Sequence, residues 1–371
     1  MLSRFLRLAG ALLLFVAAIQ KPVERVVAVG DVHGDLDRFV AILQKAGLID
    51  NASQWTGGKA TLVQLGDLVD RGPKSRGVLD FVMTLEKEAP KRGGTVLMSL
   101  GNHEVMNIIG DLKYVVPEDY AAFADSRSEQ RRRTAFQDYS RLEARKGRTA
   151  SEDLWMKGHP LGFVEHREAF GPAGKYGKWL RGLPVVNKVD DSLFLHGGIN
   201  PALGLKGVDQ INSAVKTEIQ AFDGLTRYMI GKELALPFFT LDELAQAADE
   251  EVQKTKATTE ESRTHIQILG GLLRAASWLS LHEDGPLWFR GYNSWSEAEG
   301  DLKMRELTQI FGVKRIVVAH TPQADRRIRQ RFGGKVFLID TGMVAGTASA
   351  LEIFGGHIRA LYLDGQTDLN N

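Results

Sequence analysis

Three short segments of this chain carry residues whose types and spacing could do chemistry together. They are residues 30–34 (GDVHG), 66–72 (GDLVDRG) and 101–104 (GNHE). An Asp-x-His pair can bind one cation, and an Asp from the next segment can bridge two cations with its two oxygens. Together with an Arg for phosphate and a His as an acid, these are the parts that a two-metal phosphoester hydrolase requires.

Two later histidines extend this set. His196 lies in residues 194–198 (FLHGG), and His320 lies in residues 317–322 (VVAHTP). Both follow short apolar runs that are typical of buried strands. We therefore expect both histidines at the same edge of strand ends as the first three segments.

The five segments, taken in order, resemble the signature of the phosphoprotein phosphatases within the calcineurin-like metallophosphoesterases, from about residue 27 to about residue 343. The resemblance implies two metal positions, the first formed by Asp31, His33 and Asp67 and the second by Asp67, Asn102, His196 and His320. It also implies that His103 is the general acid and that Asp70 orients it. Arg71 and Asn102 would contact phosphate oxygens.

Further segments resemble one branch, the Shewanella-like protein phosphatases. They are residues 101–107 (GNHEVMN), 110–115 (GDLKYV) and 285–292 (GPLWFRGY). In that branch Arg290 would be the second guanidinium that binds phosphate. The branch includes enzymes directed at phosphotyrosine, so we expect phosphotyrosine to be hydrolysed at least as well as phosphoserine.

The resemblance implies direct hydrolysis without a covalent phosphoenzyme. Two cations, about 3.5–4 Å apart, would share a hydroxide that attacks phosphorus in line. Arg71 and Arg290 would neutralise the equatorial oxygens, and His103 would protonate the departing oxygen. Oxygen and nitrogen ligands suit Mn, Fe or Zn, of which we favour Mn.

Each motif also has a plainer interpretation. A lone GDxHG can be a tight turn with a capping Asp, a lone His after a strand is commonly a hydrogen-bonded core residue, and Arg71 and Arg290 could be surface ion-pair residues. Five compatible segments in one order favour the metal site. We assign no such role to the other histidines, which are His159, His166, His265, His282 and His357.

The leading functional interpretation is a protein phosphatase acting on a phosphoprotein or phosphopeptide. One alternative is a symmetrical dinucleoside tetraphosphatase or another small-molecule phosphoesterase. The alternative from a different class is a phosphoprotein-binding module that has lost its chemistry. An assay with a generic aryl phosphate, combined with metal analysis, separates the module from an enzyme.

Composition excludes several classes. The chain has 371 residues, 43% hydrophobic and 25% charged, as expected of a globular protein. A net charge of +1 argues against nucleic acid as a partner. Because the chain has no Cys, a cysteine nucleophile and disulfides are excluded.

The N-terminus resembles an export signal. Arg4 and Arg7 precede an apolar run over residues 8–19, and Val16-Ala17-Ala18 offers small residues for cleavage. We expect residues 1–20 to be a signal peptide, which would place the protein in the periplasm or outside the cell. The alternatives are an uncleaved membrane anchor, the only case in which we expect membrane contact, and an organelle-targeting segment.

The remaining pattern predicts an α/β fold. Strands at residues 26–29, 61–65 and 95–99 alternate with helices at 36–48 and 75–89, which indicates a parallel sheet. Later strands are expected at residues 193–195, 316–319, 336–339, 350–353 and 358–363. We expect one catalytic domain over residues 25–365, the metallophosphoesterase β-sandwich flanked by helices, with metal ligands at the carboxyl ends of its strands.

Two long stretches interrupt the alternation, at about residues 118–178 and 207–279. The first is mostly helical and rich in Arg, and the second is expected to contain helices near residues 241–256 and 263–279. Arg131, Arg132 and Arg133 could meet an acidic substrate, although a solvated helix face is the favoured interpretation. We expect both stretches to form helical walls or a cap near the active site.

Overall fold

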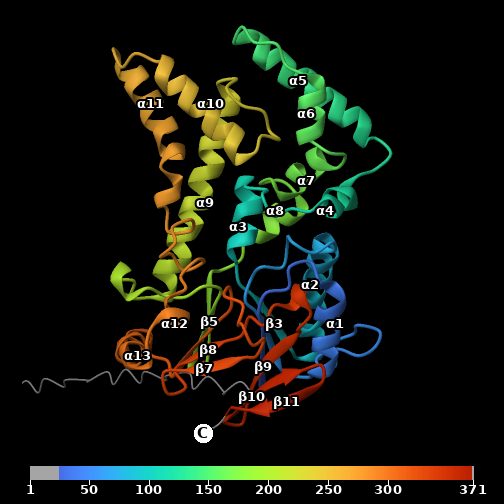
Figure 1. The fold of residues 1–371 in the computed structure, drawn as a ribbon, viewed down its shortest axis with the longest axis vertical. Coiled ribbons are helices and arrows are strands. Elements are labelled where there is room, and N and C mark those ends of the chain that lie inside the picture. The colour runs from blue at the N-terminus through green and yellow to red at the C-terminus, as the bar shows by residue number, and fades with distance from the viewer. Residues whose placement is uncertain (1–24, 370–371) are drawn as a thin grey trace, which may run out of the picture.

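The computed structural model describes residues 25–369, and its base is a pair of β-sheets (Figure 1). The first sheet has the order β11-β10-β9-β1-β2-β3, and the second has the order β4-β5-β6-β8-β7. The first sheet consists of β1 (Arg25–Val29), β2 (Thr61–Gln64), β3 (Thr95–Met98), β9 (Ser349–Phe354), β10 (His357–Tyr362) and β11 (Gly365–Asp368). The second consists of β4 (Val186–Val189), β5 (Ser192–Leu195), β6 (Arg315–Val318), β7 (Arg329–Arg331) and β8 (Val336–Leu338).

Strands β1, β2 and β3 are parallel, as their alternation with helices predicts. Val27 pairs with Leu62, which in turn pairs with Val96. Helix α1 (Leu36–Lys45) packs against β9 and β10, and α2 (Ser75–Glu88) packs against β3. Strands covered on both faces are apolar throughout, which explains why β1 reads RVVAV.

A second core lies between the two sheets. It joins Ala28 and Val63 of the first sheet to Phe194, Val317 and Phe337 of the second. In the second sheet β5, β6 and β8 are also parallel, so their carboxyl ends share one edge. The predicted β-sandwich is therefore confirmed.

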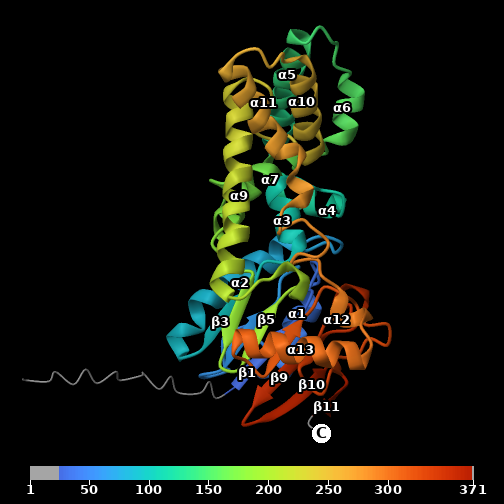
Figure 2. The ribbon, with the colours of Figure 1, turned by 90° about the vertical axis from the view of Figure 1, so that its left-hand side faces the viewer.

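Two helical groups rise from the sandwich as neighbouring arms (Figures 1 and 2). They contact each other through the rings of Tyr139 and Phe239 and through the ion pair of Arg148 with Glu250. One contains α4 (Pro117–Phe123), α5 (Ser128–Arg145), α6 (Glu152–Gly158), α7 (Phe163–Phe170) and α8 (Lys175–Leu180). The other contains α9 (Val208–Gly231), α10 (Leu241–Lys254) and α11 (Glu260–Leu273). Helix α3 (Asn102–Ile109) lies at the base between them in Figure 1. The two arms correspond to the two stretches that interrupt the sequence pattern.

The remaining helices lie close to the sandwich. Helices α12 (Gly291–Ser294) and α13 (Glu297–Phe311) lie beside the second sheet, and short 3₁₀ helices occur at Pro90–Arg92, Pro201–Leu203, Ala275–Ser277 and Met343–Ala345. No helix in residues 25–369 combines the length and the apolar character needed to cross a membrane. The expected export signal lies outside the described residues.

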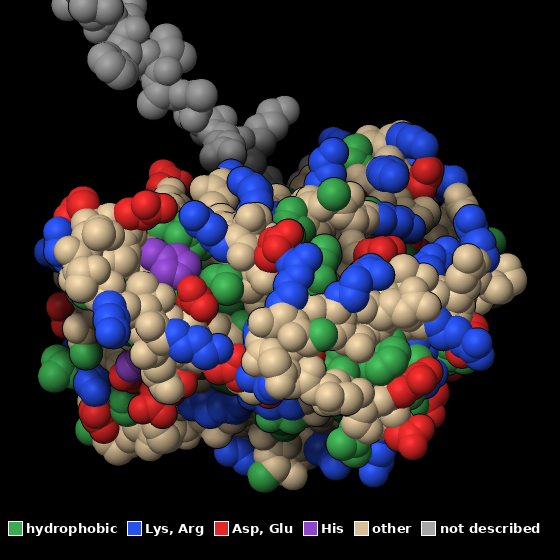
Figure 3. All heavy atoms as spheres, turned by 90° about the horizontal axis from the view of Figure 1, so that it is seen from above, with side chains coloured by type: hydrophobic (Ala, Val, Ile, Leu, Met, Phe, Trp, Pro, Cys, Tyr) green, Lys and Arg blue, Asp and Glu red, His purple; other side chains and the backbone are tan. Residues whose placement is uncertain are grey.

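Of the three arginines of α5 singled out in the sequence, Arg133 is exposed, whereas Arg131 and Arg132 are half-buried and contact α7 and α6. Arg131 pairs with Asp125 and Glu165, and Arg133 pairs with Glu129 one turn away. Seen from above, the helical end of the molecule mixes Lys and Arg with Asp and Glu (Figure 3). This surface therefore offers no continuous basic patch to an acidic partner.

Candidate metal centre

The predicted ligands come from loops that follow parallel strands. These loops carry Asp31 and His33 after β1, Asp67 after β2, Asn102 after β3, His196 after β5 and His320 after β6. Every one of these side chains is at most 5% exposed. The structure thus brings together the complete set of expected metal ligands at one edge of the sandwich.

The backbone of these loops is strained where it aims the side chains. His33, Asp67 and His320 have positive φ angles of 48°, 55° and 66°, which side chains other than Gly rarely adopt. Such residues cost on the order of 1–3 kcal/mol each and cluster at functional sites. A Cβ on Gly66 would lie 2.3 Å from the amide nitrogen of Gly101, so only glycine lets these two loops approach.

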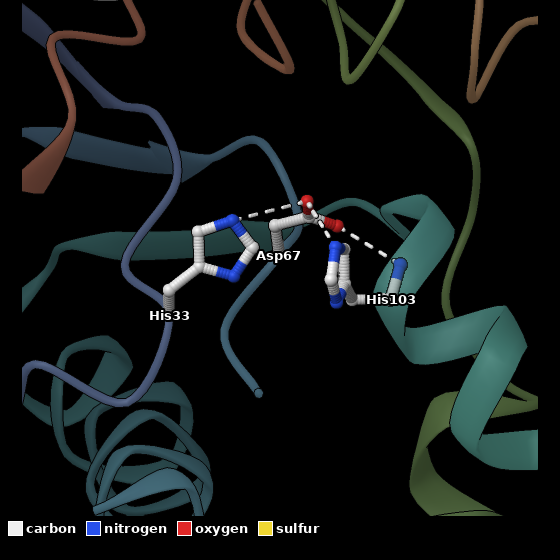
Figure 4. A group of neighbouring side chains, drawn as sticks. All are labelled: His33, Asp67 and His103. Atoms are coloured by element: carbon white, nitrogen blue, oxygen red, sulfur yellow. Dashed lines mark hydrogen bonds and ion pairs between the residues drawn. The ribbon is translucent and has the colours of Figure 1, made fainter. Parts of the chain in front are cut away.

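The first group contains Asp31, His33 and Asp67, of which Figure 4 draws His33 and Asp67. His33 Nδ1 donates to the carbonyl oxygen of Val69 at 2.9 Å, which leaves Nε2 as the free lone pair of a neutral ring. Nε2 faces Asp31 Oδ2 at 3.6 Å and Asp67 Oδ2 at 3.5 Å. It is buried and has no hydrogen-bond partner. A cation bound by both carboxylates would satisfy it.

Asp67 connects the two groups through one oxygen. Oδ2 lies 3.5 Å from His33 Nε2 and 3.3 Å from His196 Nε2. Oδ1 instead accepts from the backbone N–H of His103 at 3.0 Å, because the first turn of α3 has free donors (Figure 4). Oδ2 is therefore the oxygen of Asp67 that faces both histidines, and the bridging of two cations suggested by the sequence stays a prediction.

The second group contains four ligand atoms that face one another. His196 Nε2 lies 2.9 Å from Asn102 Oδ1 and 3.1 Å from His320 Nδ1. The opposite ring nitrogens donate to carbonyl oxygens, His196 Nδ1 to Leu65 and His320 Nε2 to Trp288. Both rings are thereby held with their other nitrogen directed inward, the orientation that a metal requires.

The charges of the carboxylates dominate the site when no metal is bound. Burial opposes a charge on His196, but Asp67 and Asp31 outweigh it and raise its pKa to about 9. His33 behaves alike: burial lowers its pKa, and the two carboxylates raise it to about 9. The pKa of His320 falls to about 3 because it is buried beside His196. The site therefore favours positive charge at the positions where cations would lie.

A second constellation adjoins the metal ligands. His103 Nδ1 donates to Asp70 Oδ2 at 2.6 Å, and Arg71 Nη2 approaches His103 Nε2 at 3.2 Å. Asp70 and Arg71 also have positive φ angles, of 69° and 67°. His103 Nε2 lies 3.8 Å from Asp67 Oδ2, so the candidate acid borders the shared carboxylate.

Arg290 reaches the same edge from the loop before α12. Its Nη1 donates to the carbonyl of His320 and to Thr321 Oγ1, both at 3.0 Å. Burial lowers the pKa of its guanidinium, and Asp31, Asp340 and Asp67 counteract this. Both arginines that the sequence singled out thus border the metal ligands.

Comparisons with known proteins agree with this geometry. A family model described as calcineurin-like phosphoesterase matches residues 24–324. The chain belongs to the calcineurin-like phosphoesterases. As a member of this family, it is a phosphoester hydrolase with the metallophosphoesterase fold.

The phosphoesterase resembles protein phosphatases over most of its length. It is 30% identical to Shewanella-like protein phosphatase 2 of Arabidopsis thaliana, covering 90% of this chain and 74% of that protein. It is 25% identical to Shewanella-like protein phosphatase 1 of Plasmodium berghei, covering 86% of this chain and 67% of that protein.

A solved structure, the cold-active protein-tyrosine phosphatase of a psychrophilic Shewanella, superposes with a TM-score of 0.60 at 25% identity, covering 94% of this chain and 81% of that chain. The match to the symmetrical bis(5'-nucleosyl)-tetraphosphatase of Escherichia coli spans only 21% of this chain and 22% of that protein, at 42% identity.

The phosphoesterase also places side chains at the site that sequence reasoning did not assign. Glu104 accepts from the backbone N–H groups of Asp67, Leu68 and Gly101, and so ties the β2 loop to α3. Tyr114 packs its ring 5.0 Å from the ring of His103. Both residues stand inside the segments that carried the resemblance, but their contacts depend on the folded loops.

Asp340 was missed as well. It is 2% exposed, its Oδ2 has no hydrogen-bond partner, and burial together with Asp31 raises its pKa well above the usual range. Its position could have indicated a place at the site, because it lies two residues after the buried strand β8, which runs parallel to β6 and ends at the same edge.

Three of the remaining histidines lie in the helical arms, outside the site. His159 stacks on Trp155, and His166 stacks on Phe170, where burial lowers its pKa to about 3. His265 lies between Tyr228 and Glu251 in the second arm.

Proposed function

We propose that this phosphoesterase is a dinuclear-metal phosphomonoesterase that acts on phosphoproteins or phosphopeptides. The observation that carries the proposal is Asp67 Oδ2, which lies within 3.5 Å of both His33 Nε2 and His196 Nε2. One oxygen shared by two ligand groups is the arrangement that a pair of cations would use. Asp31 and His33 would hold one cation, and Asn102, His196 and His320 would hold the other.

The metal ions would activate water and neutralise phosphate charge when bound. Carboxylate, amide and imidazole ligands suit Mn, Fe or Zn, and we propose Mn. All four protein groups of the second position present lone pairs rather than protons when the ring of His196 is neutral. The donor set thus fits a divalent cation of this kind.

The side chains around the ligands would do the remaining work. Arg71 and Arg290 would bind the nonbridging oxygens of the phosphoryl group and offset the charge that spreads over them. Because Asp70 accepts the Nδ1 proton of His103 and orients the ring, Nε2 is the nitrogen that would deliver a proton to the departing oxygen. This assigns His103 as the general acid and Asp70 as the group that orients it.

Phosphotyrosine is the substrate that we propose within this class. The resemblance to protein phosphatases covers most of the chain, whereas that to the tetraphosphatase covers 21% of it. A neighbour in structure is named a protein-tyrosine phosphatase. A phenolate also departs more easily than an alkoxide, so it depends less on protonation by His103.

The test is hydrolysis by the metal-loaded chain of three substrates at equal concentration: 4-nitrophenyl phosphate, a phosphotyrosine peptide and diadenosine tetraphosphate. The proposal predicts turnover of the first two and little of the third. Turnover of the dinucleotide alone would replace the proposal with the tetraphosphatase, and metal binding without any turnover would indicate a binding module.

A further inference from the structure

Arg167 of α7 is a buried cation without a carboxylate partner in the part of the chain that the structure describes. It is 7% exposed, and its Nε has no hydrogen-bond partner. Burial, helped by the nearby Arg181, lowers the pKa of its guanidinium to about 10. Because burying an unpaired charge costs free energy, the one hydrogen bond that the Arg167 side chain makes among the described residues is of interest.

That hydrogen bond is to α3, the helix that carries Asn102 and His103. Arg167 Nη1 donates to the carbonyl oxygen of Asn107 at 2.7 Å, in the last turn of α3. Carbonyls of a last turn lack partners within the helix, and a cation there also interacts favourably with the helix dipole. Glycine follows at position 110, where a Cβ would lie 2.9 Å from Arg167 Nη2. The first helical arm thus caps the helix that begins with Asn102 and His103.

The side chain of Asn107 continues this connection into the site. Its Nδ2 donates to Asp70 Oδ1 at 2.9 Å and to the carbonyl oxygen of His103 at 3.0 Å. Asp70 Oδ2 accepts from His103 Nδ1 at 2.6 Å. Both oxygens of Asp70 are therefore occupied, and the plane of its carboxylate is fixed by Asn107 and His103 together.

The same arm holds the backbone of Asp70 through a second path. The N–H of Asp70 donates to Ser75 Oγ at 3.0 Å, and Ser75 Oγ donates to Asp119 Oδ2 of α4 at 2.8 Å. Two helices of one insertion thus reach Asp70 by two paths, α7 through Asn107 to its carboxylate and α4 through Ser75 to its backbone N–H.

We propose that Asn107 and Arg167 are positioning residues for the His103–Asp70 pair. Asn107 holds the carboxylate against the imidazole, and Arg167 holds Asn107 by capping α3. The first insertion is then a support for the general acid as well as a wall beside the site. The kinetic part of this inference rests on the proposed function, because it takes His103 as the acid.

The kinetic test uses Asn107→Ala, Arg167→Met and Arg167→Lys, with Arg181→Met as the matched control. Arg181 is also a largely buried arginine of this arm, but it pairs with Asp223 rather than with α3. We expect Asn107→Ala and Arg167→Met to lower kcat for phenyl phosphate at least about tenfold more than for 4-nitrophenyl phosphate, since only the poorer leaving group needs full protonation. KM should change little, Arg167→Lys should recover part of kcat, and the control should keep the wild-type ratio.

A second readout does not depend on activity. The short His103–Asp70 hydrogen bond should give a far-downfield imidazole proton signal in the metal-free chain, assigned by its loss in His103→Asn. We expect this signal to shift or broaden in Asn107→Ala and Arg167→Met and to stay unchanged in Arg181→Met. If the wild type hydrolyses no phosphoester, the proposed function fails while this signal still tests the positioning. An unchanged signal, or a kcat loss equal for both substrates, would overturn the inference.

Discussion

His196 Nε2 and His320 Nδ1 face each other at 3.1 Å, and each ring donates its other nitrogen's proton to a backbone carbonyl. If both rings were neutral, the lone pairs on these two facing nitrogens would repel each other. The metal-free chain resolves this with a proton, because the pKa of His196 is raised to about 9 and that of His320 is lowered to about 3. A cation in the place of that proton would satisfy both rings.

The first prediction is that Asp67→Asn loses bound metal from both positions. The substitution removes the negative charge that the two groups share through Oδ2, while an amide oxygen can still accept from the N–H of His103. Metal content after gel filtration should fall from two ions per chain to less than one, and turnover should fall with it. Asp111→Asn, two residues beyond the end of α3, is the control and should retain both ions. Wild-type metal content in Asp67→Asn would remove the basis of the shared position.

The second prediction is that His103→Asn keeps metal and loses turnover. Its side chain is 3.8 Å from Asp67 Oδ2 and is not needed to hold either cation. We expect kcat to fall by about 10²–10⁴-fold for alkyl phosphates. The deficit should shrink as the pKa of the leaving group falls, measured over a series of aryl phosphates. A deficit of the same size for every leaving group would contradict the role of His103 as an acid.

The third prediction concerns stability and pH. Burial, together with Asp70 and Glu118, raises the pKa of Asp119 from 3.8 to about 7 in the folded chain. Between these values the unfolded chain releases a proton that the folded chain retains, so stability falls as pH rises from about 4 to about 7. Above pH 7 the penalty is complete, at about 4 kcal/mol or less.

Asp119→Asn removes this titration. The difference in unfolding free energy, wild type minus variant, should therefore decrease as pH rises through that window and then level off. Urea denaturation of the two metal-free chains at several pH values measures it. A difference that is constant from pH 4 to pH 7 would show that Asp119 titrates normally.

The fourth prediction is that phosphotyrosine peptides are hydrolysed at least as well as phosphoserine peptides of the same sequence. Tyr114 and Arg71 border His103, and the Arg71 guanidinium lies 5.2 Å from the centre of the Tyr114 ring, so an aromatic surface adjoins the phosphate-binding residues. The measurement is kcat/KM on matched peptides. A tenfold preference for phosphoserine, about 1.4 kcal/mol of transition-state discrimination, would contradict it.

The sequence was sufficient to predict the scaffold of the site. The runs at Val27 and Leu62 alternate with amphipathic helices, which requires parallel strands, and parallel strands place the residues after them at one edge. The sequence therefore predicts that Asp31, Asp67 and His196 lie at this edge, and the structure places them there.

Two elements of the fold, strand β7 and helix α9, were not predicted from the sequence. Strand β7 has the sequence RQR and exists because Arg331 pairs with Glu297 and its strand pairs with β8. Helix α9, at 24 residues the longest helix of the described chain, was missed although its buried residues Ile211, Val215 and Ile219 recur at helical spacing. The sequence of β7 alone does not show that Glu297 and β8 will lie beside it.

Contacts between distant segments could not be predicted at all. The hydrogen bond from Arg167 to Asn107 joins residues 60 positions apart. Asp340 Oδ2 has no hydrogen-bond partner, and the sequence does not show that Asp31 lies near enough to raise the pKa of Asp340. The tautomers of His196 and His320 likewise depend on carbonyl groups of Leu65 and Trp288, which no sequence pattern specifies.

The central claim is that two cations at Asp67 make this chain a phosphomonoesterase, and one titration tests it most directly. The chain is stripped with a chelator, Mn²⁺ is added in steps, and bound metal and hydrolysis of 4-nitrophenyl phosphate are measured in the same samples. We predict no hydrolysis by the stripped chain and a rise in activity that ends when two ions are bound. Hydrolysis that persists without metal, or none with two ions bound, would contradict the account.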